Sequence, residues 1–192
     1  MFNLITKSKI RQKIILLLVY NPKKSYYLNE IARFVKVSSG TTQREIRRLE
    51  EAGLLIKEKR GNSVYFKINT TNPLFNDFKN IVDKTIGIEN ILKQMFQRVK
   101  NIDFVFLFGS YVKKDFNSDS DIDLYVIGNI EEKELHQFIK KAEEKTYREI
   151  NYHFSVREDF QKKIKESFFH KEILKNFTLI IGNENEFRKF IN

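Results

Sequence analysis

Two aspartates that lie one residue apart, Asp121 and Asp123, have the types and spacing that suit metal chemistry. The apolar segment around them, residues 122–127, predicts a β-strand, and alternate side chains of a strand point to the same face. Two carboxylates held side by side repel each other unless a divalent cation compensates their charge. Oxygen ligands suit Mg²⁺, particularly Mg²⁺ that also contacts phosphate groups. The pair therefore predicts a Mg²⁺ site with Asp121 and Asp123 as ligands.

A Gly-Ser pair, Gly109 and Ser110, precedes the aspartates by a spacer of ten residues and follows a second predicted strand, residues 104–108. Glycine lets phosphate oxygens approach the backbone, and the serine hydroxyl and the amides of a following turn can donate to them. Together with the metal site, this arrangement predicts a nucleoside triphosphate site in which Gly109 and Ser110 bind the nucleotide. An Asp-x-Asp pair alone is common in loops, and we interpret Asp115 and Asp119 of the spacer as loop solvation.

Strands and helices alternate around these motifs. From apolar periodicity we expect strands over residues 104–108, 122–127, 149–156 and 178–181, and helices over residues 131–147 and from residue 158. An apolar stripe from Phe75 to Val99, interrupted only at Gly87, predicts a connecting helix over residues 73–100. The C-terminal domain is then expected over residues 101–192.

The stretch of residues 104–127 resembles the signature of the minimal nucleotidyltransferases in the DNA polymerase β superfamily, which carries Gly-Ser, a ten-residue spacer and Asp-x-Asp. The resemblance implies an α+β fold with a mixed sheet and flanking helices. It also implies Mg²⁺ on Asp121 and Asp123, a triphosphate held by Gly109 and Ser110, and transfer of a nucleotidyl group.

Active members of that superfamily typically carry a third carboxylate on a following strand, and this sequence departs from that pattern. In the predicted strand over residues 149–156, alternation places Glu149, Asn151 and His153 on one face. The position that aligns with the third acid is Asn151, and an amide cannot act as a base at neutral pH. Glu149 is therefore the expected third catalytic residue, and His153 is a weaker substitute. If Glu149 does not reach the site, the site should bind nucleotide better than it catalyses transfer.

The net charge of +10 is confined to the first third of the chain. Residues 1–72 contain fifteen Lys and Arg against five Glu, whereas the rest of the chain is balanced. A confined excess of positive charge is what a polyanion-binding module needs to attract phosphates and displace their counterions. The alternative is a solvated basic face without a partner.

The first 72 residues predict a helix-turn-helix with a wing. Helical spacing of apolar residues, followed by two short runs of strand type about a tight Arg60-Gly61-Asn62 turn, gives helices over residues 10–18, 28–35 and 42–49 and strands over 54–59 and 63–68. Ser39 is expected to cap the third helix and Gly53 to end it.

The charged residues of the third helix lie on the side opposite its apolar residues, so they are expected to face solvent. The residues expected there, together with one on the hairpin, are Thr41, Arg44, Arg47, Arg48 and Arg60. Residues 27–69 resemble the winged helix-turn-helix of prokaryotic transcriptional regulators, which implies that this helix binds the major groove of double-stranded DNA. Glutamates interleave with the arginines, however, and such pairs are also typical of an ordinary solvated helix.

Three hypotheses of function follow. The first is a DNA-binding protein that transfers a nucleotidyl group to an acceptor that the sequence does not identify. The second is a regulator whose nucleotidyltransferase-like domain is catalytically weak and serves nucleotide sensing or assembly, and the third is an antitoxin-like partner of a toxin subunit. The chain has no cysteine, which fits the cytoplasm, and its longest apolar run, residues 14–20, is too short to span a membrane. The stripe over residues 75–99 could also form a homodimer interface.

Overall fold

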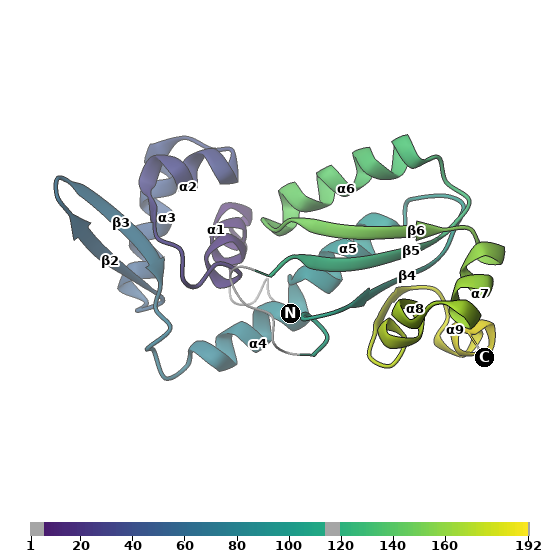
Figure 1. The fold of residues 1–192 in the computed structure, drawn as a ribbon. Coiled ribbons are helices and arrows are strands. Elements are labelled where there is room, and N and C mark those ends of the chain that lie inside the picture. The colour runs from purple at the N-terminus through teal and green to yellow at the C-terminus, as the bar shows by residue number, and fades with distance from the viewer. Residues whose placement is uncertain (1–5, 114–119, 192) are drawn as a thin grey trace. The chain divides into compact units, whose positions relative to one another are not determined.

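A computed structural model describes residues 6–113 and 120–191 and divides the chain into two compact units, one ending at Ile88 and one beginning at Glu89 (Figure 1). Each unit combines helices with one sheet, so the predicted α+β class is confirmed. No helix among the described residues is long and apolar enough to cross a membrane.

The N-terminal unit is a winged helix-turn-helix, as predicted. Its elements are α1 (Lys9–Val19), β1 (Tyr26–Tyr27), α2 (Leu28–Val35), α3 (Ser39–Glu51), β2 (Leu55–Arg60), β3 (Ser63–Ile68) and α4 (Phe75–Thr85). The strands form an antiparallel sheet in the order β1-β3-β2, in which β2 and β3 are the wing and the two-residue β1 was not predicted.

Local sequence sets the ends of α3 and of the hairpin. The cap of α3 is Ser38, whose side chain accepts a hydrogen bond from the amide of Thr41, so the predicted cap Ser39 is wrong by one residue. Gly53 follows the helix with φ of 69°, the left-handed conformation that the prediction required. Arg60 pairs with Ser63, which leaves a two-residue turn at the tip of the hairpin.

The predicted single connecting helix is wrong, because the structure has two helices, α4 and α5 (Ile88–Phe96). The break falls at Gly87, where a Cβ would lie 2.5 Å from the Tyr20 hydroxyl and 2.6 Å from the Asp83 carbonyl oxygen. The Tyr20 hydroxyl donates to Asp83 Oδ1 (2.7 Å) and accepts from the amide of Ile88 (3.2 Å). Contacts with Tyr20 therefore fix the break between the two helices at Gly87, where the sequence showed only an interruption of the apolar stripe. The domain limits 1–72, 73–100 and 101–192 stay a prediction.

The C-terminal unit is built on a four-stranded mixed sheet, as predicted. After α5 its elements are β4 (Ile102–Phe108), β5 (Ile122–Gly128), α6 (Glu132–Thr146), β6 (Ile150–Ser155), α7 (Arg157–Glu166), α8 (Phe168–Ile173), β7 (Thr178–Ile181) and α9 (Glu184–Ile191). The order is β6-β5-β4-β7, with β5 parallel to β6 and the other pairs antiparallel. The single helix expected from residue 158 is two helices, and α9 was not predicted.

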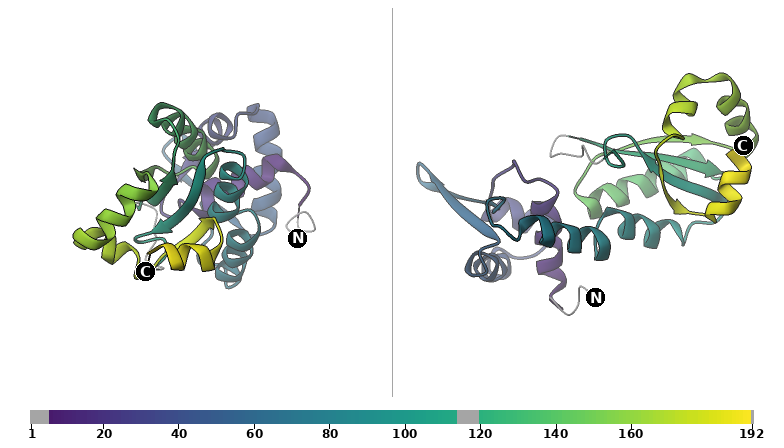
Figure 2. Two further views of the ribbon diagram at one scale, coloured as in Figure 1. Left: turned by 90° about the vertical axis from the view of Figure 1, so that its right-hand side faces the viewer. Right: turned by 90° about the horizontal axis from the view of Figure 1, so that it is seen from below.

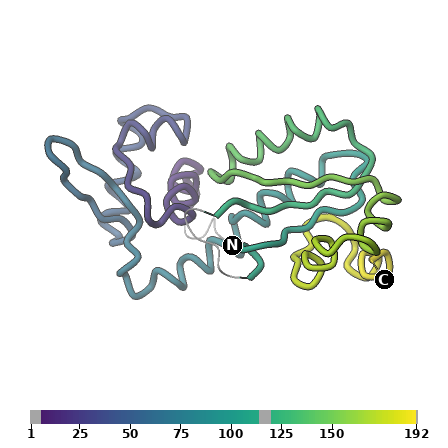
Figure 3. Tube along the Cα trace, in the orientation of Figure 1, coloured from purple at the N-terminus to yellow at the C-terminus, as the bar shows by residue number. Residues whose placement is uncertain are grey.

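Aromatic side chains fill one side of this sheet. Phe104, Phe106 and Phe108 alternate along β4 and pack in one buried cluster with Phe160 of α7 and Phe187 of α9. Helices α7 and α8 lie on this side, whereas α5 and α6 lie on the other (Figures 1 and 2). The chain trace makes clear that β5 and β6 start at the same end of the sheet (Figure 3). Helices therefore cover both faces of the sheet whose strands carry the predicted site.

Candidate functional site

A close backbone approach joins the Gly-Ser turn to one of the aspartates. β4 ends at Phe108, which pairs with Asp123 of β5, and Gly109 follows with φ of 70°. A Cβ at Gly109 would lie 2.1 Å from Oδ2 of Asp123, so a side chain there would collide with the carboxylate. The amide of Lys113 donates to the carbonyl oxygen of Gly109 (3.2 Å) and closes the turn that contains Ser110. Glycine is therefore required both by the backbone conformation and by the contact.

The two aspartates differ in environment. Asp121 is exposed just before β5, and Asp123 is half-buried within it. Burial raises the pKa of the Asp123 carboxyl above its ordinary value, and the charge of Asp121 acts in the same direction. Among residues 6–113 and 120–191, no ion pair to a Lys or Arg relieves either carboxylate. The pair thus concentrates negative charge that a bound cation would compensate.

Asn151 occupies the register position opposite Asp123 on the parallel strand β6. Its Nδ2 donates a long hydrogen bond of 3.4 Å to Asp123 Oδ1, which lowers the pKa of that carboxyl and opposes the effect of burial. The expected third acid, Glu149, is exposed immediately before β6, and its backbone carbonyl accepts from the amide of Ile122 (2.9 Å). In the described part of the chain no three His, Cys, Asp or Glu residues form a group that could hold a metal ion. An amide, not an acid, therefore faces Asp123.

His153 lies one alternation beyond Asn151, deeper along the same face of β6. Its ring stacks on Tyr125 (5.7 Å, 16°) and contacts Phe108 (5.9 Å) and Phe169 of α8 (4.9 Å). Burial lowers the pKa of the His153 imidazole, although the Asp123 carboxylate acts in the opposite direction. The rings of Phe108, Tyr125, His153 and Phe169 thus form an aromatic cluster next to the site, on the side of α8.

A polar network next to this aromatic cluster was not predicted from the sequence. The Tyr125 hydroxyl makes hydrogen bonds with Ser155 Oγ (2.8 Å) and with Nε2 of the buried His170 (3.0 Å). Lys163 Nζ donates to the same Ser155 Oγ (2.8 Å). Only the position of Tyr125, two residues after Asp123 on the same strand, was a signal of this network, because nothing in the sequence places α8 against β5.

The structure brings the predicted nucleotide and metal residues together at the ends of adjacent strands. Gly109 contacts Asp123 directly, Ser110 follows in the same turn, and Asp121 is near enough to influence the pKa of Asp123. The roles assigned to these residues and to Glu149 stay predictions. Asp115 and Asp119 lie outside the described residues.

Four of the predicted DNA-binding side chains, Thr41, Arg44, Arg47 and Arg48, belong to α3. Arg47 pairs with Glu51 (3.4 Å) and Arg48 with Glu45 (3.4 Å), whereas Arg44 reaches only the hydroxyl of Thr41 (3.5 Å) among the described residues. These contacts leave the arginine side chains largely exposed and available to a partner.

Two further residues of this surface make contacts that the sequence did not predict. Glu45 is buried, not solvated, and accepts from Arg11 Nε of α1 (2.7 Å), so it ties α3 to α1. Arg60 pairs with Glu58 (2.8 Å), donates to Ser25 (3.1 Å) and lies over an aromatic ring of the hairpin. Its predicted role in DNA binding stays untested.

The comparisons with known proteins agree with this architecture. The family described as "Polymerase beta, Nucleotidyltransferase" matches residues 90–186, just over half of the chain. The chain belongs to the polymerase beta nucleotidyltransferase family. Its N-terminal part, residues 7–56, matches the family described as "Winged helix-turn-helix DNA-binding". The chain thus combines a DNA-binding winged helix with a nucleotidyltransferase domain.

Solved structures with similarity to either half are distant. A crystal structure of a toxin–antitoxin with AMP-PNP is 15% identical, with a TM-score of 0.42 over 54% of this chain and 80% of that chain. The transcriptional regulator BldR from Sulfolobus solfataricus is 16% identical, with a TM-score of 0.40 over 52% of this chain and 68% of that chain. A search of curated proteins gave no match.

Proposed function

We propose that this protein binds double-stranded DNA through its winged helix and uses its nucleotidyltransferase domain to transfer a nucleotidyl group from a nucleoside triphosphate to an acceptor. The observation that carries the proposal is the contact between the Gly109 turn and Asp123, with Asp121 beside it. The Gly109 turn and two carboxylates that pair with no Lys or Arg of residues 6–113 and 120–191 lie at one edge of the sheet. The family match over residues 90–186 supports the same activity.

Each residue of this edge has a role in the proposal. Ser110 and the amides of the turn after Gly109 bind the triphosphate, since the missing side chain lets phosphate oxygens approach the backbone. Asp121 and Asp123 would hold Mg²⁺ through their carboxylate oxygens, the ligand type that Mg²⁺ prefers. The raised pKa of Asp123 supports this fit, because a bound cation would offset the cost of its buried charge. When bound, the ion would offset the charge of the phosphates and of the carboxylates.

Removal of the acceptor proton is the step for which the site is least equipped. Asn151 faces Asp123 but cannot accept a proton at neutral pH. We propose Glu149 as the base, because its exposed side chain precedes β6 directly and its backbone is held against Ile122, next to Asp121.

A second function is favoured by the hydrogen bond from Asn151 to Asp123. An amide in that position keeps the pair competent to bind a nucleotide while it removes a carboxylate from the reaction. On this hypothesis the domain senses a nucleotide or mediates assembly and transfers few nucleotidyl groups. The function of the protein is then exerted through DNA binding by the winged helix.

One experiment separates the two hypotheses. The purified protein is incubated with Mg²⁺ and labelled nucleoside triphosphates, with itself and duplex DNA as acceptors, and label transfer, pyrophosphate release and nucleotide retention are measured. Transfer by the wild type that Asp121→Ala abolishes and Glu149→Gln reduces would support catalysis. Equal transfer by wild type and Asp121→Ala, or none by either, would exclude catalysis by this site on those acceptors. Metal-dependent retention without transfer, together with a gain of transfer in Asn151→Asp, would favour sensing.

DNA binding is tested separately. We expect Arg44→Ala with Arg47→Ala to weaken duplex binding and to reduce the slope of log affinity against log salt by up to about 1.8, or about 0.9 per lost phosphate contact. The matched control is Lys140→Ala with Lys141→Ala on α6, which removes the same charge from the other domain. An unchanged affinity and slope in the α3 variant would show that α3 is not the reader.

Two expectations about partners belong to the same proposal. A homodimer would appear as twice the chain mass in sedimentation equilibrium, and a monomer at all concentrations would refute it. An antitoxin-like role requires a toxin subunit whose activity the purified protein suppresses, and suppression that survives Asp121→Ala would show that binding alone is sufficient.

A further inference from the structure

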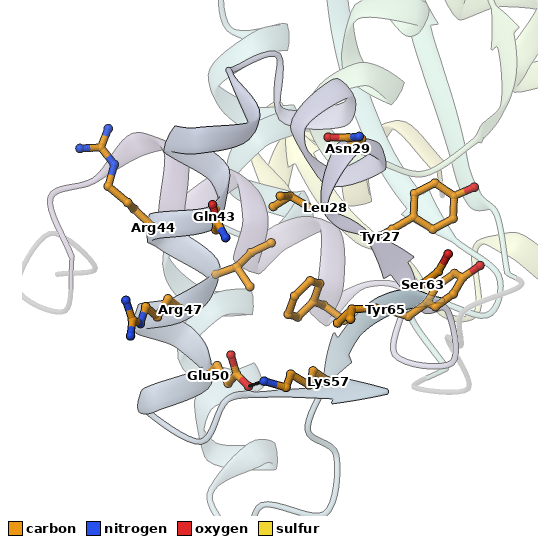
Figure 4. A pocket seen from close by; sticks show the side chains of 13 residues that line it. Tyr27, Leu28, Asn29, Gln43, Arg44, Arg47, Glu50, Lys57, Ser63 and Tyr65 are labelled. Atoms are coloured by element: carbon orange, nitrogen blue, oxygen red, sulfur yellow. Dashed lines mark ion pairs between the residues drawn. The ribbon is translucent and has the colours of Figure 1, made fainter. Parts of the chain in front are cut away.

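A groove of about 900 Å³ lies between α3 and the β2–β3 hairpin (Figure 4). Its lining includes the apolar side chains of Leu28 of α2, Ile46 of α3 and Phe66 of β3. Tyr27 and Tyr65 form its far side, with ring centroids 5.1 Å apart, and both carry hydroxyl groups. The groove therefore offers both apolar contact and hydroxyl hydrogen-bond donors.

The charges of the groove are arranged unevenly. Arg44 and Arg47 extend from α3 on the side away from the hairpin, and Lys57 of β2 lies on the opposite wall (Figure 4). Lys57 Nζ forms an ion pair with Glu50 Oε1 of α3 at 3.6 Å, which bridges one end of the groove. Glu50 is the acidic residue in a lining that otherwise carries positive or uncharged groups.

This combination suits one strand of a DNA duplex. Deoxyribose offers an apolar face, and each nucleotide adds a phosphate that Lys57 and the two tyrosine hydroxyls could contact. The arginines on the outer side of α3 would at the same time face the bases of the major groove. An apolar peptide carries no negative charge along its length for Lys57 to bind, so charge complementarity favours the DNA strand.

Glu50 works against this occupant. Lys57 cannot contact a phosphate at full strength while it is paired with Glu50. The side chains of Lys57 and Glu50 are 61% and 34% exposed, and an ion pair this exposed contributes little to stability. Loss of the Lys57–Glu50 ion pair would therefore lower the stability of the fold only slightly.

We propose that Lys57 and Glu50 form a partner-exchange pair, in which Lys57 leaves Glu50 to bind a phosphate of the DNA strand that lies in the groove. Glu50 thereby limits the affinity of the winged helix for DNA. The inference rests on the proposed DNA binding and adds the position of the strand and the residue that restrains its binding.

The test measures duplex affinity and its salt dependence in variants of the full chain. Glu50→Gln should raise affinity about two- to fivefold, the range expected when an exposed ion pair of this kind is removed. Lys57→Gln should lower affinity and reduce the salt slope by about 0.9, which corresponds to one phosphate contact. The double variant should behave like Lys57→Gln alone, because Glu50 acts through Lys57.

The matched control is Asp77→Asn on α4, an exposed acid of the same structural unit that does not line the groove. It changes the net charge by the same amount, so a general electrostatic effect would raise its affinity as much as Glu50→Gln does. Equal effects, or a lower affinity in Glu50→Gln, would overturn the inference, as would an unchanged salt slope in Lys57→Gln. If the wild type does not bind duplex at low salt, the proposed function fails instead. Circular dichroism of each variant excludes unfolding as the cause.

Discussion

Replacement of Gly109 by alanine tests the geometry on which the nucleotidyl transfer proposal depends. At φ of 70° an alanine loses about 1–2 kcal/mol relative to glycine, because its Cβ crowds the following carbonyl oxygen. The new methyl group would also lie 2.1 Å from Asp123 Oδ2 and 2.9 Å from Asp123 Cγ. The carboxylate must then rotate away, and an off-rotamer side chain costs about 0.5–1.5 kcal/mol. Stability should therefore fall modestly while the position of the metal ligand is lost.

Gly53→Ala is the matched control for backbone strain. Gly53 has φ of 69°, nearly the same as Gly109, but a Cβ there would meet only Asn72 Nδ2 at an ordinary 3.5 Å. Gly53→Ala should lower the midpoint of thermal unfolding by roughly 2–8 °C and Gly109→Ala by roughly 3–14 °C, from about 2–4 °C per kcal/mol for a chain of this length. Nucleotide binding that depends on Mg²⁺ should fall about 10- to 100-fold in Gly109→Ala alone, the range seen when a residue that orients a metal ligand is changed.

The assay is equilibrium dialysis of a labelled nucleoside triphosphate, with Mg²⁺ and with excess chelator, so that the metal-dependent fraction is measured. Unfolding is followed in parallel by circular dichroism. Metal-dependent binding that is equal in Gly109→Ala and Gly53→Ala would refute the reasoning, because the contact between Gly109 and Asp123 would then have no consequence for the ligand.

Two other predictions concern stability. Burial, with help from Lys163, lowers the pKa of His170 below its ordinary value of 6.5, so its contribution to stability is complete above pH 6.5 and is lost as the pH falls from there toward the folded-state pKa. His170→Gln should make unfolding free energy less dependent on pH in that window, where one proton can contribute at most about 1.4 kcal/mol per pH unit, and equal slopes in urea titrations would contradict this. Gly87→Ala should cost about 1–3 kcal/mol, since its Cβ would lie 2.5 Å from the Tyr20 hydroxyl, whereas Gly40→Ala, with open space around it, should be neutral or stabilising. Equal unfolding midpoints for these two glycine variants would refute the packing argument.

Much of the winged helix could be predicted because its elements are defined by local signals. The apolar period gave the bounds of α2, and Gly53 ended α3 in the left-handed conformation. The break between α4 and α5 could not be predicted in this way, since it depends on Tyr20, a residue far away in sequence. The burial of Glu45 depends likewise on Arg11 of another helix.

The same division holds for the candidate site. The types and spacing of Gly109, Asp121 and Asp123 predicted one nucleotide and metal site, because strand alternation and the backbone freedom of glycine act over a few residues. Whether Asn151 or Glu149 faces Asp123 was fixed only by the register of two parallel strands joined through α6.

The sequence by itself determined the kinds of element, the confined positive charge and the pair of carboxylates with its Gly-Ser turn. Only the tertiary structure decided that an amide meets Asp123, that Lys57 is held by Glu50 across a groove, and that His170 is buried against Tyr125. The physical reason is that backbone conformation and side-chain periodicity are local, whereas burial and partner choice depend on which distant elements pack together.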